Sequence, residues 1–139
     1  MSDRLISDDT IAILTVWMEA RGQPMDGQQG VAEVILRRTK NRFQSDGTIT
    51  STCLWPLAFS AWNATDRQRM AAIRLLEDSP GIPEARAAWY AAQLGSDLSK
   101  GANSYLNPAT LLKLSKPLPK WASDEKFTVK IADHCFYKV

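Results

Sequence analysis

Residues 8 to 21 carry apolar side chains on almost every side of a helical projection, with Thr15 interrupting the run IAILTVWMEAR. A helix that is hydrophobic all round is usually buried. Ser7 before the run can cap the first turn, and Gly22 after it can end the helix in the left-handed conformation. The pattern therefore predicts a buried core helix over residues 8–21.

A second helix is predicted over residues 26–41, where apolar positions recur with the spacing of one helical face. The side chains expected on its inner face are those of Val31, Ala32, Val34, Ile35 and Leu36. The side chains expected on its outer face are those of Gln29, Glu33, Arg37 and Lys40. Basic residues, Arg38 among them, crowd its last turn, where positive charge suits the helix dipole, so this cluster needs no ligand to explain it.

The rest of the chain alternates between irregular and regular stretches. In order, the predicted elements are a loop over 43–63, helices over 66–78 and 83–94, an irregular stretch GANSYLNP after Gly95, and one or two short strands within 126–139. The fold class is therefore mainly α (α+β), with a small C-terminal β element. The length suits a single domain over residues 1–139.

The chain has 139 residues, of which 45% are hydrophobic and 23% are charged, and both shares are ordinary for soluble globular proteins. A net charge of +2 is too small to indicate a nucleic-acid partner. The charge is uneven, because residues 100–139 hold seven Lys against three acids. We interpret this segment as a solvated, lysine-rich surface, and attraction to an anionic polymer is the alternative.

The N-terminal sequence MSDRLISDD is polar and acidic, unlike a secretory signal peptide. No apolar run approaches the ~20 residues that span a membrane, so stable membrane insertion is not expected. We therefore expect synthesis in the host cytoplasm and a separate route to any site of action outside it. The two cysteines, Cys53 and Cys135, do not make a disulfide framework.

Glu19 occupies an unusual position for a carboxylate, near the C-terminal end of an apolar helix. Burial and the partial negative charge of a helix end both disfavour the charged form, so we expect a raised pKa for Glu19. A carboxylic acid that stays protonated near neutral pH can act as a general acid. From position alone, the alternative is that Glu19 faces water or pairs with Arg21.

Four segments, spread over about residues 17–138, match one family pattern in order and spacing. They are MEARGQPMDGQQGVAEVILRR, the pair Phe59-Ser60, GANSYLNP followed by Trp121, and IADHCFYK. Together they resemble the SleB/CwlJ-type cell wall hydrolases, the spore cortex-lytic enzyme family. The sequence departs from the family pattern at four positions. Gln23 stands where the pattern has Glu, and Arg37 stands where it has Asn. Leu106 stands where it has a ring or polar residue, and Ala132 stands where it has Gly.

The resemblance implies a lysozyme-like fold of the lytic transglycosylase kind. It also implies cleavage of peptidoglycan between N-acetylmuramic acid and N-acetylglucosamine. The matched acid is Glu19, which would protonate the glycosidic oxygen and then act as a base in the same turnover. In a lytic transglycosylase the C6 hydroxyl of the sugar attacks the anomeric carbon, so no second carboxylate is required. Hydrolytic glycosidases need a second one roughly 5–9.5 Å away, and Glu33, expected to face outward, does not suit that role.

Sugars bind through aromatic stacking and through hydrogen bonds from amides and hydroxyls. The substrate-binding candidates, all in the matched segments, are Ser60, Tyr105, Asn107, Trp121, Phe59 and His134. The rings of Phe59 and Trp121 are apolar enough to belong to the core instead. Because His134 is the single histidine, a typical catalytic zinc site with two His ligands is excluded, and we expect no metal or cofactor.

Other functions stay open from the sequence. Cys53 as a thiolate nucleophile with His134 as its base would make an amidase or endopeptidase acting on peptidoglycan stem peptides. A hydrolytic lysozyme and a non-catalytic peptidoglycan-binding or virion module are further alternatives. We favour the glycan-cleaving enzyme. The short chain without an export signal suggests a phage endolysin, a monomer that a holin releases to the wall in the periplasm.

Overall fold

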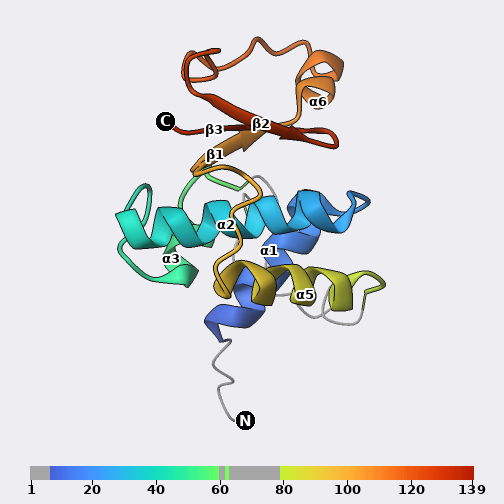
Figure 1. The fold of residues 1–139 in the computed structure, drawn as a ribbon, viewed down its shortest axis with the longest axis vertical. Helices are drawn as coiled ribbons and strands as arrows, with labels where there is room; N and C mark the ends of the chain where they lie inside the picture. Colours follow the sequence, from blue (N-terminus) through green and yellow to red (C-terminus); the bar gives the residue numbers. More distant parts are fainter. Residues whose placement is uncertain (1–6, 60–61, 63–78) are drawn as a thin grey trace.

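The computed structural model describes residues 7–59, 62 and 79–139. The helix predicted over 66–78 and the candidate residue Ser60 lie outside them. In the described part, the longer helices pack together and a small sheet with one short helix beside it occupies one end of the molecule (Figure 1). Within these residues, no helix is both long enough and apolar enough to cross a membrane.

The three longest described helices make most of the core. They are α1 (Asp8–Ala20), α2 (Met25–Asn41) and α5 (Ile82–Gln93). The helices predicted over these parts of the chain are confirmed, each within one residue at both ends. The first helix begins as expected, because the Ser7 hydroxyl accepts a hydrogen bond from the backbone N–H of Thr10.

Short elements also lie where the sequence pattern predicts none. Within the predicted loop there is a helix, α3 (Ile49–Cys53), and within the predicted irregular stretch there is a strand, β1 (Ser104–Leu106). A further short helix, α6 (Pro108–Lys113), follows that strand. The loop and irregular-stretch predictions were wrong at these points, because a few residues carry no measurable periodicity. Caps fix the two helices instead: the side chains of Thr48 and Asn107 accept hydrogen bonds from their first turns.

The sheet has three antiparallel strands in the order β1-β3-β2. The strands predicted near the C-terminus are confirmed as β2 (Phe127–Ile131) and β3 (His134–Tyr137). In the pairing of β1 with the central strand, Tyr105 lies opposite Phe136. This register matters for the site, because it fixes the position of Tyr105.

The sheet packs on α2 through a small apolar cluster of Val34, Ala102 and Phe136. Gly30 makes this approach possible: a Cβ at that position would lie 2.6 Å from Cζ of Phe136. No side chain fits such a gap, so glycine sets how closely the central strand approaches the helix.

The prediction of an outward face on α2 was wrong for two of its four residues. Glu33 is 2% exposed, and Arg37 is partly buried against the segment between α5 and β1. Lys40 is exposed and Gln29 is half-buried. The sheet and this segment cover part of α2, so the helix is enclosed on more sides than an amphipathic pattern predicts.

Candidate active site

A short hydrogen bond joins two residues that stand 86 positions apart in the sequence. The Tyr105 hydroxyl donates to Oε1 of Glu19 at 2.6 Å. Glu19 lies in the last turn of α1 and Tyr105 lies in β1, and both are half-buried. The helix and the sheet therefore meet at a carboxylate and a phenol, which is a pair that can hold and move a proton.

The end of α1 presents Glu19 at the edge of the core. Trp17 is buried two residues before Glu19, whereas Gly22 is exposed and left-handed, with φ +83°. The guanidinium of Arg21 lies 4.5 Å above the ring of Trp17. The helix thus ends one residue after Glu19, at Ala20.

The Tyr105 ring is held by other rings. His134 meets it edge-on at 5.1 Å between centroids, and Phe136 and Phe59 lie at 5.9 Å and 6.5 Å. Burial raises the pKa of the Tyr105 phenol well above its ordinary value, and the charge of Glu19 and the hydrogen bond to it raise that pKa further. Tyr105 therefore stays protonated and is the donor in the pair.

Arg38, on α2, holds the strand that carries Tyr105. Its Nε–H donates to the Asn103 carbonyl at 2.6 Å and Nη2 donates to the Ser104 hydroxyl at 3.3 Å. Its guanidinium also lies 5.3 Å from the ring of Phe59. Burial lowers the pKa of Arg38, while electrostatic interactions with Tyr105 and with the Glu19 carboxylate act in the opposite direction. A permanent positive charge thus lies close enough to act on the carboxylate–phenol pair.

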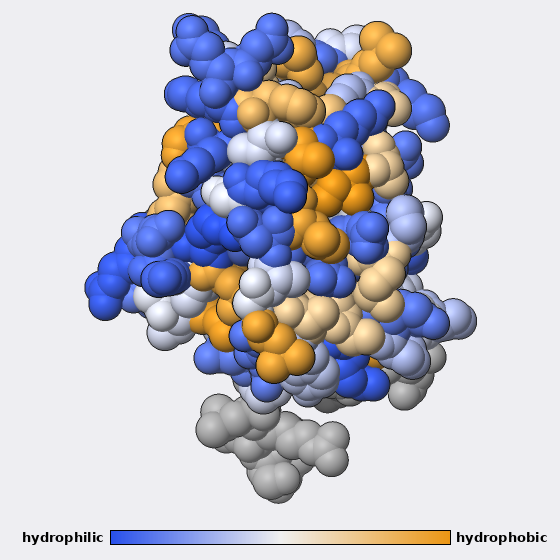
Figure 2. All heavy atoms as spheres, viewed as in Figure 1, coloured by the Kyte–Doolittle hydropathy of each residue, from blue (hydrophilic) through white to orange (hydrophobic). Residues whose placement is uncertain are grey.

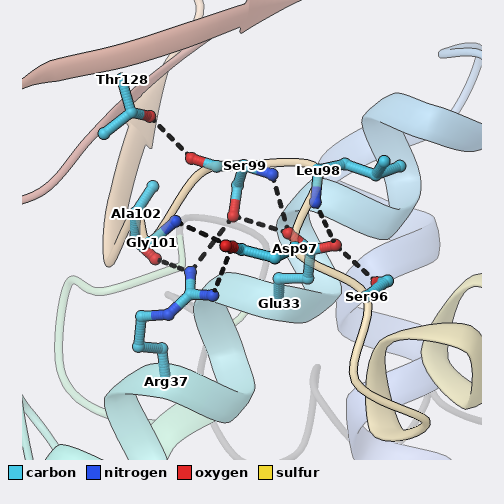
Figure 3. A network of polar contacts seen from close by, with 9 residues as sticks. All are labelled: Glu33, Arg37, Ser96, Asp97, Leu98, Ser99, Gly101, Ala102 and Thr128. Carbon is cyan, nitrogen blue, oxygen red and sulfur yellow. Dashed lines mark hydrogen bonds and ion pairs between the residues drawn. The ribbon is translucent and has the colours of Figure 1, made fainter.

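A polar network fastens the segment leading into β1 onto α2 (Figure 3). The Glu33 carboxylate accepts four hydrogen bonds of 2.5–2.9 Å from this segment, whose donors are the Ser96 hydroxyl, the backbone N–H of Leu98, and the N–H and hydroxyl of Ser99. Arg37 forms an ion pair of 2.9 Å with Asp97 and also donates to the Ala102 carbonyl. These contacts fix the start of β1 and therefore the position of Tyr105 relative to α1.

A second set of hydrogen bonds joins the residues after α1 to the turn between β2 and β3. Nε2 of Gln23 donates to Oδ2 of Asp133 at 2.9 Å, and the Asp133 N–H donates to Oε1 of Gln23 at 3.2 Å. The turn contains Ala132 in the left-handed conformation, with φ +52°. Gln23 and Ala132 both depart from the family pattern, and the contact of Gln23 is with Asp133, the residue after Ala132.

The pocket beside Tyr105 brings two of the candidate substrate-binding residues together. Tyr105 and Trp121 both line a pocket of about 200 Å³, and its other walls include Arg38 and Ser104. Trp121 is half-exposed and packs edge-on against Tyr137 at 5.4 Å. One aromatic face and several hydrogen-bonding groups around a small pocket suit a sugar.

The other candidates have different surroundings. Phe59 is 1% exposed, so its ring belongs to the core, the alternative that the sequence left open. Asn107 is half-buried, and its amide oxygen caps α6 by accepting from the N–H of Thr110 at 3.2 Å. His134 is 4% exposed, and its Nδ1 is buried without a hydrogen-bond partner among the described residues. Burial lowers the pKa of His134, which outweighs the attraction of Asp133 for its proton.

Cys53 lies in surroundings that disfavour a thiolate. It is buried in the main hydrophobic cluster, and burial raises the pKa of its thiol to about 12. A nucleophilic cysteine needs a lowered pKa and access to substrate. In the part of the chain that the structure describes, no three His, Cys, Asp or Glu side chains gather as metal ligands would.

Sequence reasoning missed the role of Arg38, although a signal was present. Counting from Val31, the positions i+3, i+4 and i+7 of α2 are Val34, Ile35 and Arg38, and all four residues are buried. An arginine on the inner face of an apolar helix must find buried acceptors, which marks it as a partner of another element.

The family model for cell wall hydrolases matches residues 22–137 of this chain. A spore cortex-lytic enzyme of Halalkalibacterium halodurans is 38% identical over 106 residues, which are 75% of this chain and 29% of that protein. The chain therefore spans less than a third of the length of this relative. Tyr105 lies inside the matched residues, whereas Glu19 lies just before them.

Two solved structures have the same fold. The catalytic domain of the germination-specific lytic transglycosylase SleB from Bacillus anthracis matches with a TM-score of 0.71 and 27% identity, over 99% of this chain and 100% of that one. The catalytic domain of SleB from Bacillus cereus matches with a TM-score of 0.69 and 28% identity, over 98% and 94%. The predicted mainly helical, lysozyme-like fold class is confirmed. Because the family model matches most of this chain, residues 22–137, the chain belongs to the cell wall hydrolase family.

Proposed function

We propose that residues 1–139 form one catalytic domain, which cleaves peptidoglycan between N-acetylmuramic acid and N-acetylglucosamine as a lytic transglycosylase. The observation that carries the proposal is the 2.6 Å hydrogen bond from Tyr105 to Glu19. The two structural relatives, described as the catalytic domains of SleB, one of them a lytic transglycosylase, support the reaction class.

In the proposed reaction Glu19 is the general acid and then the general base. It donates a proton to the glycosidic oxygen, the bond to the anomeric carbon breaks, and N-acetylglucosamine leaves with the proton. The C6 hydroxyl of the muramic acid then attacks the anomeric carbon and gives its own proton to Glu19. The products carry a 1,6-anhydro bond, no water is consumed, and Glu19 is protonated again.

Tyr105 has a supporting role in this scheme. Its hydroxyl stays protonated, so it remains a donor when Glu19 becomes a carboxylate. A donor placed where negative charge develops stabilises the charged form without rearrangement. The positive charge of Arg38 acts in the same direction. That Glu19 carries its proton before the reaction stays a prediction, and the acidic and basic limbs of the pH–rate profile test it.

The surroundings of two other acids support a scheme with one catalytic carboxylate. The Glu33 carboxylate is occupied by four donors of the segment before β1. Asp133 accepts from Gln23. In a hydrolytic lysozyme a second carboxylate must act as a nucleophile or activate water, and neither of these acids is free of structural contacts.

For the substrate we propose a site along the pocket that Tyr105 and Trp121 share, where Trp121 stacks on a sugar ring. Asn107, Ser60 and His134 stay candidates for polar contacts. The buried Nδ1 of His134, which has no partner among the described residues, supports a role for it. The protein acts, in this proposal, as a monomeric endolysin that a holin releases to the wall. Expression in a bacterial host should then cause lysis only when a holin is co-expressed.

Two substitutions test the chemistry. Glu19→Gln preserves the shape of the side chain and removes its acidic proton. Wall lysis should therefore fall roughly 10²–10⁴-fold, the usual contribution of general acid–base catalysis, while the far-UV circular dichroism spectrum stays unchanged. Cys53→Ser should leave lysis nearly intact. Full activity of Glu19→Gln would overturn the catalytic assignment, and loss of activity only in a folded Cys53→Ser protein would favour cleavage of the stem peptides.

A further inference from the structure

The segment from Pro108 to Lys120 carries apolar side chains that nothing in the described structure covers. It consists of α6 and the loop after it, and no residue of α6 is buried. Leu112 is 81% exposed, Leu114 is 58% exposed and Leu118 is 57% exposed. Single exposed leucines are common, but three within seven residues form a local apolar surface, and such surfaces mark contact sites.

The same segment is strongly basic. Lys113, Lys116 and Lys120 alternate with the leucines, and all three are exposed. The sequence holds no Asp or Glu between Asp97 and Asp124. No acidic side chain within the segment can therefore neutralise these lysines. At this end of the molecule, hydrophilic and apolar residues are interspersed on the surface (Figure 2).

The segment has a defined shape. The side chain of Asn107 caps its first turn, and the Lys116 N–H donates to the Leu111 carbonyl at 2.9 Å to close the end of α6. After the segment, Trp121 packs against Tyr137 of the central strand. The segment that carries the leucines and lysines thus lies at the end of the molecule that carries the sheet (Figure 1).

The chemistry of the segment discriminates between possible occupants. A glycan would stack on aromatic faces, and the exposed apolar side chains here are aliphatic. A second copy docking through the same surface would bring the lysines of both copies together, and like charges repel. An anionic lipid surface satisfies both features, because acyl chains accept the leucines and headgroup phosphates attract the lysines.

We propose that residues 108–120 dock this protein onto membranes that contain anionic lipids. The contact is peripheral: the leucines enter the interface between headgroups and acyl chains, and the lysines remain among the phosphates. This activity goes beyond wall cleavage and does not rest on the assignment of Glu19, because none of the residues of the segment belongs to the pocket beside Tyr105. Docking would hold a wall-cleaving enzyme at the membrane side of its substrate.

The test is flotation of the full chain with vesicles of phosphatidylglycerol and phosphatidylcholine in equal parts, beside vesicles of phosphatidylcholine alone. We expect binding to the anionic vesicles and at least tenfold weaker binding to the neutral ones. The double variant Leu112→Ser/Leu114→Ser should bind the anionic vesicles at least tenfold more weakly. The triple variant Lys113→Gln/Lys116→Gln/Lys120→Gln should also bind weakly and lose the salt dependence of the wild type.

Leu94→Ser is the matched control, since Leu94 is 90% exposed at the end of α5, outside the segment. It should bind vesicles like the wild type, and all variants should keep the wild-type far-UV spectrum and cleave soluble glycan fragments normally. Absence of wild-type binding to the anionic vesicles, or undiminished binding by the leucine variant, would overturn the proposal. Association that the leucine variant loses, but that occurs with purified wall sacculi or with a second copy instead of vesicles, would overturn it as well.

Discussion

The hydroxyl of Tyr105 donates a 2.6 Å hydrogen bond to the carboxylate of Glu19, and this contact joins the end of α1 to the first strand of the sheet. The two residues are held in place by different parts of the molecule. The last turn of α1 fixes the carboxylate, whereas Arg38 and the Glu33 network fix the strand that carries the phenol.

Replacing Tyr105 with Phe removes the donor and keeps the ring in its aromatic surroundings. A hydrogen bond to a charged group contributes about 1.5–3 kcal/mol, which corresponds to a loss of roughly 10–100-fold in the rate of wall lysis. The free energy of unfolding, measured in urea, should stay close to that of the wild type, whereas the rate of wall lysis falls. Tyr90→Phe is the control, because Tyr90 is 46% exposed on α5; equal rates for the two variants would remove Tyr105 from the mechanism.

Replacing Arg38 with Met or Lys tests whether the strand depends on the guanidinium fork. Arg38→Met leaves the Asn103 carbonyl and the Ser104 hydroxyl without their donor, so its free energy of unfolding should fall by about 3 kcal/mol. Arg38→Lys keeps the positive charge and should lie between Met and the wild type in lysis rate. Lys40→Met, on the exposed side of the same helix, should leave both quantities unchanged. A stable, fully active Arg38→Met protein would contradict the assigned role.

His134 predicts a particular dependence of stability on pH. Its pKa in the folded protein is lower than the ordinary value of 6.5, so protonation favours the unfolded chain. The stabilisation is fully present above pH 6.5 and is lost as the pH falls below that value toward the folded pKa. Because the chain has a single histidine, His134→Gln should flatten urea-unfolding stability across this window. An unchanged slope would mean that His134 is not buried as a neutral ring.

Ala132 offers a test of the turn between β2 and β3. A left-handed alanine costs about 1 kcal/mol, which the flexibility of glycine in the unfolded chain offsets by about half. Ala132→Gly, which restores the residue of the family pattern, should therefore raise the free energy of unfolding by roughly 0.5 kcal/mol. Ala109→Gly in α6, where the backbone is helical, should lower it instead. The same sign for both variants would contradict the strain at Ala132.

The sequence anticipates the parts of this molecule that depend on local pattern. The buried run before Glu19, the ends of three helices and the strands near the C-terminus all follow from periodicity and caps, and the order of the matched segments named both Glu19 and Tyr105. Contacts over long sequence distances could not be read this way. Glu33 seemed solvent-facing because its neighbours on α2 are polar, yet residues 96–99 return across it and supply its donors.

Arg38 illustrates the same limit from the other side. Its position in register with Val31 and Val34 indicates burial, but only the fold reveals that its acceptors belong to the strand of Tyr105. The preference for a glycan-cleaving acid over a cysteine nucleophile gains a physical reason from the fold, since Cys53 lies in the core with a pKa of about 12.

The most direct test of the central claim is mass spectrometry of peptidoglycan digested by the wild-type protein and by Glu19→Gln. A lytic transglycosylase that uses Glu19 as its acid and base should release muropeptides with 1,6-anhydromuramic ends, and Glu19→Gln should release almost none. Reducing muramic ends in the wild-type digest would instead identify a hydrolase. Free stem peptides with intact glycan strands would contradict glycan cleavage altogether.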